Sequence, residues 1–139
     1  MTYDHPRPVR VSAMDPIYAF LLSFPMACFT LTLITDIAYT QTLNLLWLHF
    51  SEWLLLAGLV FGIVAAVIYL VDFIVRRVRP AWSAVLMGIV VLLLAALNSF
   101  IHTSDGWTAV VPYGLAVSAL TVIAIVLTGW LEWRSVRHV

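Results

Sequence analysis

The sequence is poor in charged residues and contains no lysine. Of its 139 residues, 10% are charged and 63% are hydrophobic, whereas a soluble domain is about a quarter charged and about half apolar. A soluble fold of this length cannot bury so much apolar surface, because small domains bury the smallest fraction of theirs. The composition therefore predicts that lipid forms part of the solvent. The formal net charge is zero, so no attraction to nucleic acid is indicated.

Cysteine is almost absent as well. The single residue, Cys28, excludes an internal disulfide and a CxxC site, and it gives no sign of the redox compartment. It lies in an apolar run, which favours a packing role. No cleavage site of the A-x-A type follows the first apolar run, so we expect that run to be a retained helix and not a signal peptide.

Long apolar runs are what the sequence does contain. A bilayer core about 30 Å thick requires roughly 20 apolar residues in a helix. Strands are excluded, because an open sheet edge cannot face lipid. The sequence predicts an all-α membrane protein, an up-down bundle of four transmembrane helices. We expect an N-terminal arm at 1–15, a membrane domain at 16–133 and a tail at 134–139. The four spans are expected at about 16–39, 45–75, 80–101 and 107–131.

The arginines predict the orientation of these spans. Four spans place the arm, the middle loop and the tail on one side, and all seven arginines fall in or beside these three segments. Cytoplasmic segments carry the excess of basic residues. We therefore expect both termini to be cytoplasmic, in the inner membrane of a bacterium.

Proline and glycine mark two features within the spans. Pro25 removes a backbone hydrogen bond in the first span and predicts a bend that opens space beside the second or fourth helix. Gly58 and Gly62 form a GxxxG pattern, which lets helices approach closely in lipid. The pattern fits a dimer face or packing inside the bundle. We favour packing, and a homo-oligomer stays open.

Ionisable residues near the expected cytoplasmic boundary form one cluster. Asp72 and Arg76 are four residues apart with the acid first, the favourable order for a helical pair. Long arginine side chains at this depth can reach water, so the sequence favours an anchoring role. The inner cluster consists of Asp72, Arg76, Arg77, Arg79, Glu132 and Arg134.

A second cluster is expected at the outer ends of the helices. Ionisable residues inside a membrane are functional candidates by default. His49 and Glu52 are three residues apart on one helix face, and we expect both to face inward, because exposing Glu52 to lipid is costly. The outer cluster consists of Asp36, His49, Glu52, Asn98, His102 and Asp105.

Four interpretations of the outer cluster remain open. Its groups could simply satisfy one another and cap helix ends. They could relay protons or bind a quinol headgroup. His49 and His102 could hold a haem between them, although their depths differ by roughly 7 Å at 1.5 Å per residue. A metal could bind the imidazoles and carboxylates, but His49-x-x-Glu52 occurs once and reversed relative to the usual Glu-x-x-His pair.

Several stretches resemble a known family. They are the run from Asn98 to Pro112, the later Gly114-Leu, Ser118 and Thr128-Gly129-Trp130, and in the second span Glu52 to Gly58 with Asp72-Phe73. From about Asp15 to the C-terminus the chain resembles the bacterial membrane family catalogued as domain of unknown function 2231. The resemblance implies the four-helix architecture, and the family has no established activity to transfer.

The chain departs from that family at its start. Many members carry a histidine-rich segment ending in His-Phe-Pro, where this sequence has Asp15, Tyr18 and Ser23 before Pro25. A metal or haem role of that segment therefore does not transfer. At the outer site only His102, with Asn98 and Asp105, carries the resemblance. Some members are encoded beside periplasmic quinoprotein sugar dehydrogenases, so the resemblance implies such a dehydrogenase, or another membrane subunit, as a partner.

Three functions are compatible with the sequence. The small size, short loops and lack of a nucleophile–base arrangement favour a non-catalytic membrane subunit or anchor, and argue against an enzyme. The alternative is an electron-transfer or quinol-handling subunit that uses the outer cluster. A small proton-coupled transporter with Glu52 as its site is the third, although no inverted repeat is visible and Glu52 is off the midplane.

Overall fold

The chain folds into four long helices and one short irregular turn. The computed structural model describes residues 14–76, 82–104 and 110–137. The helices are α1 (Met14–Thr42), α2 (Leu45–Arg76), α3 (Trp82–Thr103) and α4 (Leu115–Arg137), and the short turn η1 (Val110–Gly114) precedes α4.

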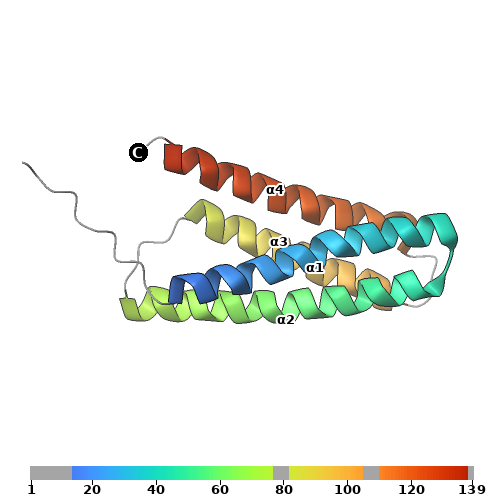
Figure 1. Cartoon of the computed structure of the whole chain (residues 1–139), viewed down its shortest axis with the longest axis horizontal. Coiled ribbons are helices and arrows are strands. Elements are labelled where there is room, and N and C mark those ends of the chain that lie inside the picture. The colour runs from blue at the N-terminus through green and yellow to red at the C-terminus, as the bar shows by residue number, and fades with distance from the viewer. Residues whose placement is uncertain (1–13, 77–81, 105–109, 138–139) are drawn as a thin grey trace, which may run out of the picture.

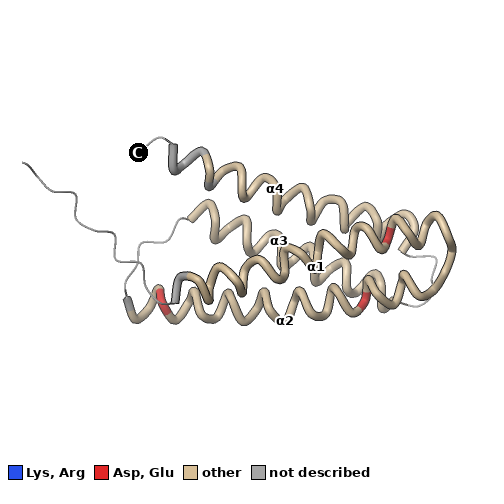
Figure 2. Tube along the Cα trace, in the orientation of Figure 1, with Lys and Arg blue, Asp and Glu red and all other residues tan. Residues whose placement is uncertain are grey.

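The helices run alternately up and down in one bundle (Figure 1). The start of α1 and the end of α4 lie at the same end of the bundle, and the tight α1–α2 turn lies at the opposite end (Figure 1). All four are long and apolar enough to cross a membrane. In the part of the chain that the structure describes no strand occurs. The structure thus confirms the predicted fold class. The described acidic residues lie towards the ends of the helices (Figure 2).

The inner face of α2 consists of two leucines and four small residues. Its buried positions are Leu48, Ser51, Leu55, Gly58, Gly62 and Ala65. Their spacing of three and four residues is that of a helix packed in a left-handed bundle. Large apolar side chains such as Trp53, which is 70% exposed, point outward, where lipid supplies the apolar contact.

The α1–α2 turn and the start of α2 are fixed by local hydrogen bonds. Leu43 has a positive φ of 53°, and its backbone N–H donates to the carbonyl of Tyr39 at 2.8 Å, closing α1. The side chain of Asn44 accepts from the N–H of Leu46 at 3.0 Å, as an N-cap residue does. Two residues are therefore enough to reverse the chain.

The fourth span does not begin as a continuous helix. We expected it to start near Trp107, which lies outside the described residues. Val111 instead has extended backbone angles, φ −118° and ψ 117°, and the peptide bond to Pro112 is cis. A residue before proline is pushed out of the helical region because the proline ring clashes with it. The regular helix therefore begins only at Leu115.

Gly58 and Gly62 pack inside the bundle, which confirms the favoured interpretation of the GxxxG pattern. A Cβ on Gly58 would lie 2.5 Å from the ring of Phe29 on α1. A Cβ on Gly62 would lie 2.6 Å from Leu92 on α3. Phe29 belongs to a core cluster with Leu55 and Ala95. The two glycines therefore let α2 approach two neighbouring helices.

We predict that Gly58→Ala destabilises the bundle. The added methyl overlaps the buried Phe29 ring, and overpacking a core costs about 1–3 kcal/mol, which exceeds the gain of up to about 1 kcal/mol in helix propensity. Gly129→Ala is the matched control, because nothing lies within 4 Å of its added Cβ. Unfolding of both variants in mixed micelles, followed by helical circular dichroism, measures the difference. Equal midpoints would contradict the prediction.

Candidate functional site

Asp36 lies at the centre of a buried polar network that joins all four helices. Its side chain on α1 has no solvent exposure. Ser51 of α2 donates to its Oδ1 at 2.5 Å, and Ser118 of α4 donates to its Oδ2 at 2.5 Å. The Nε2 of His102, on α3, lies 2.9 Å from Oδ1. One carboxyl group therefore contacts a side chain from each of the other three helices.

The geometry around His102 fixes how many protons the pair holds. Its Nδ1 lies 2.9 Å from the backbone carbonyl of Asn98, and a carbonyl only accepts, so Nδ1 carries a proton. Nε2 then faces the Asp36 carboxyl with one further proton between them. Either His102 is an imidazolium beside a carboxylate, or a neutral imidazole accepts from a protonated Asp36. In both forms the pair is neutral overall, which is the form a membrane interior tolerates.

A second layer of hydrogen bonds holds the serines. Asn98 donates from Nδ2 to the Ser118 oxygen at 2.7 Å, one helical turn before His102. Thr35 Oγ1 lies 2.7 Å from the Ser51 oxygen and 2.9 Å from the backbone carbonyl of Thr32. Asn98 Oδ1 is buried and has no hydrogen-bond partner in the described ranges 14–76, 82–104 and 110–137.

Gly114 allows the His102 ring to reach Asp36. A Cβ at Gly114 would lie 3.0 Å from the Cε1 of His102. The break in η1 places the backbone of Gly114 against the ring, so the irregular start of the fourth span is part of the site. Val110, at the other end of η1, is buried against Tyr39 and Leu48.

His49 and Glu52 do not join this network. They pair with each other at 3.2 Å on α2, and the His49 side chain is 59% exposed while that of Glu52 is 31% exposed. The expectation that both face inward is wrong for His49. The physical reason is the period of the helix. Ser51 occupies the inward position, and His49, two residues before it, therefore lies on the opposite face.

The other expected residues divide into two groups. Asp36, Asn98 and His102 are brought together, whereas Asp105 lies outside the described residues. Of the inner cluster, Asp72 is half-buried on α2. Its remaining members, Arg76, Arg77, Arg79, Glu132 and Arg134, are residues whose side chains the structure does not describe.

Sequence reasoning missed Ser51 as a member of the network and used Ser118 only as a family match. Neither residue is ionisable, so a search for charged groups at membrane depth passes over both. A usable signal was present: Ser51 is in phase with Leu48, Leu55, Gly58 and Gly62, and small residues at three- and four-residue spacing mark the inward face of a membrane helix.

The network has little free capacity to bind a ligand. Both ring nitrogens of His102 and both carboxylate oxygens of Asp36 have protein partners. In the described part of the chain, no three His, Cys, Asp or Glu side chains are grouped so that they could hold a metal ion. The donors present therefore do not fit a haem or a shared metal unless the network is rearranged.

The comparison with protein families agrees with this architecture. No curated protein and no solved structure matches the chain. Residues 14–138, which include all four helices and every described residue of the network, match the family described as a predicted membrane protein. The chain belongs to this family of membrane proteins, DUF2231.

Proposed function

We propose that the chain is a non-catalytic membrane subunit that anchors a partner protein, in the inner membrane of a bacterium. The observation that supports this most directly is the closure of the Asp36 network. A catalytic or cofactor site needs a group that is held in place and still available to a ligand. Here the Nε2 of His102 and both carboxylate oxygens of Asp36 are used to hold one helix to another, and the Nδ1 of His102 is bonded within α3. Such an arrangement fixes the outer end of the bundle.

Purified protein tests this proposal. We expect protein extracted in mild detergent from cells that make haem to show no Soret band and no stoichiometric metal. We also expect a photo-crosslinker placed at Thr42 or Ser104, both exposed at the outer helix ends, to give one dominant adduct with another protein in intact cells. The control position is Ile63, which is 56% exposed in mid-span. A Soret band or bound metal that His102→Leu removes, or no protein adduct at either end, would overturn the proposal.

A second candidate is proton or quinol handling at the same residues. The observation that favours it is the 2.9 Å contact between the buried Asp36 carboxyl and the Nε2 of His102, since buried pairs of this kind occur in proton relays. Quinol oxidation by proteoliposomes containing the protein and a soluble electron acceptor distinguishes the two. Activity that Asp36→Asn abolishes, while the protein stays folded, would favour the second candidate over the anchor.

The orientation of the subunit is a prediction of its own. In the up-down bundle, the start of α1, the end of α2 and the end of α4 lie together, and the arginines cluster in these parts of the sequence. We expect this end to be cytoplasmic, because basic residues are retained on that side. In a Cys28→Ala background, cysteines at Thr42 and Ser104 should react with an impermeant maleimide in intact cells. Cysteine at Arg77 should react only after permeabilisation, and the reverse pattern would contradict the model.

A further inference from the structure

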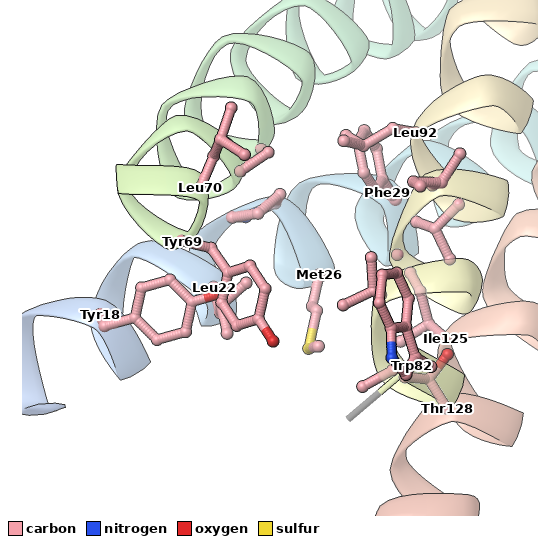
Figure 3. Close-up of a pocket in the computed structure, with 18 of the residues that line it drawn as sticks. Tyr18, Leu22, Met26, Phe29, Tyr69, Leu70, Trp82, Leu92, Ile125 and Thr128 are labelled. Atoms are coloured by element: carbon pink, nitrogen blue, oxygen red, sulfur yellow. The ribbon is translucent and has the colours of Figure 1, made fainter. Parts of the chain in front are cut away.

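A large apolar cavity, open on one side, lies between the helices at the end opposite the Asp36 network. Its volume is about 660 Å³, and all four helices contribute to its lining, a size within the roughly 300–1,000 Å³ of typical ligand pockets. Figure 3 shows Tyr18 and Tyr69 on one side, Trp82 and Thr128 on the other, and Met26 between them. Tyr18 and Tyr69 stack with their ring centroids 6.2 Å apart.

The cavity exists because the helices diverge. α4 runs beside α1 near the outer end and separates from α1 and α2 towards the end that carries the chain termini (Figure 1). The burial pattern follows the same course. The buried residues of α3 are Ala95, Asn98 and His102, all in its second half. On α4 burial does not continue beyond Ala124 among its described side chains.

The depth of the cavity matches one leaflet of a bilayer. Along α1 its lining extends from Tyr18 to Phe29, and along α3 from Trp82 to Leu92. Ten or eleven residues at 1.5 Å each span about 15–16 Å. Half of a hydrocarbon core about 30 Å thick is about 15 Å. The lining therefore covers the depth that a lipid chain of that leaflet occupies, and it stops near the midplane.

The entrance of the cavity combines aromatic side chains with nearby positive charge. Trp82 begins α3, and Tyr18 lies in the second turn of α1, so both are at the depth where aromatic rings meet lipid headgroups. Phe73 lines the cavity only three residues before Arg76, the last residue of α2. Arg134 and Arg137 lie in the last turns of α4, at the same end of the bundle, so three of the seven arginines of the sequence have their backbones here.

We propose that this cavity binds an anionic phospholipid of the adjoining leaflet, with an acyl chain between the α1–α2 pair and the α3–α4 pair. The apolar lining excludes a polar ligand, since unpaired polar groups are costly to bury. The aromatic entrance and the arginines select the headgroup, because basic sites between helices bind anionic lipid heads. The site is independent of the Asp36 network and of the anchor role.

Native mass spectrometry of the whole protein tests the site. Wild-type protein is transferred to detergent micelles with equal amounts of phosphatidylglycerol and phosphatidylcholine that carry the same acyl chains. We expect one phosphatidylglycerol molecule to stay bound at collision energies that remove phosphatidylcholine. Equal retention of the two lipids would overturn the headgroup assignment. Retention of a quinone or a free fatty acid in place of the phospholipid would overturn the choice of occupant.

A pair of glycine variants locates the binding. Gly88 lines the cavity, and Gly129 does not, although neither would bring an added Cβ within 4 Å of another group. Gly88→Phe should fill part of the cavity and lower retained phosphatidylglycerol about tenfold, while Gly129→Phe should leave it unchanged. Equal retention by both variants would contradict the proposed site. If Gly88→Phe does not fold, Ala66→Phe, at another lining position on α2, takes its place.

Discussion

Asp36→Ala should lower the free energy of unfolding by about 3–5 kcal/mol, as removal of one partner from a buried pair typically does. The reason is that three side chains lose their hydrogen-bond partner at once. Ser51, Ser118 and His102 all point at Asp36 from other helices, and a buried donor without a partner retains its full desolvation cost. We expect the loss to appear as separation of the helix ends that carry the network, not as loss of helix within each span.

The measurement is the unfolding midpoint in mixed micelles, followed by circular dichroism and by the reactivity of Cys28, which is buried beside Gly58 near the middle of α2. Glu52→Gln is the control, since Glu52 belongs to a partly exposed pair with His49 and makes no hydrogen bond to Asp36 among the bonds of that carboxyl group, and exposed pairs are worth about 0–1 kcal/mol. Asp36→Asn should fall between the two because it keeps the volume and one acceptor. Equal losses for Asp36→Ala and Glu52→Gln would show that the network does not hold the bundle.

The architecture could be predicted from the sequence because length and composition determine it in a membrane. A run of about 20 apolar residues has few alternatives to a spanning helix. The α2 helix, Leu45–Arg76, was expected at 45–75 for this reason. The irregular start of the fourth span was not predictable from hydropathy, since the residues Val110–Gly114 are as apolar as those of the helix that follows. Pro112 was the available signal, through its effect on Val111.

The candidate site residues were selected by their depth along the spans and not by the helix face on which they lie. Depth correctly put Asp36, Asn98 and His102 at the same level, and the structure joins them. It also put His49 there, which points outward. In a soluble protein apolar periodicity identifies the inward face, but lipid reverses that signal, and the small residues Ser51 and Gly58 mark the inside. The pairing of Asp36 with Ser51 and Ser118 could not be predicted, because helical phase places a residue on the inward face and does not say which residues of distant helices meet there.

The coupling between Asp36 and His102 should be the strongest pairwise interaction in the bundle. His102→Leu alone leaves the Asp36 carboxylate buried without the group that shares its proton, and we expect it to lower the free energy of unfolding by about 3–5 kcal/mol. The double variant Asp36→Asn/His102→Leu removes both ionisable groups and keeps an acceptor for Ser51 and Ser118. It should cost less than the sum of the two single changes by about 1–3 kcal/mol, the range measured for residues in one network.

A matched cycle with Cys28→Ala gives the reference for additivity. Cys28 is buried on the same helix as Asp36, eight residues away and thus about 12 Å along the axis, and it lies beside Gly58 of α2. Cys28→Ala and His102→Leu should therefore add within about 0.5 kcal/mol.

The outcome of the Asp36–His102 cycle distinguishes the possible roles of the pair. If this cycle is equally additive, the two groups do not share a proton in the folded protein. If the coupling is strong and the double variant regains stability but loses quinol oxidation, the pair has a redox role besides its structural one. If the double variant regains stability and the crosslinked adduct at Thr42 or Ser104 persists, the network has the structural role that a membrane anchor requires.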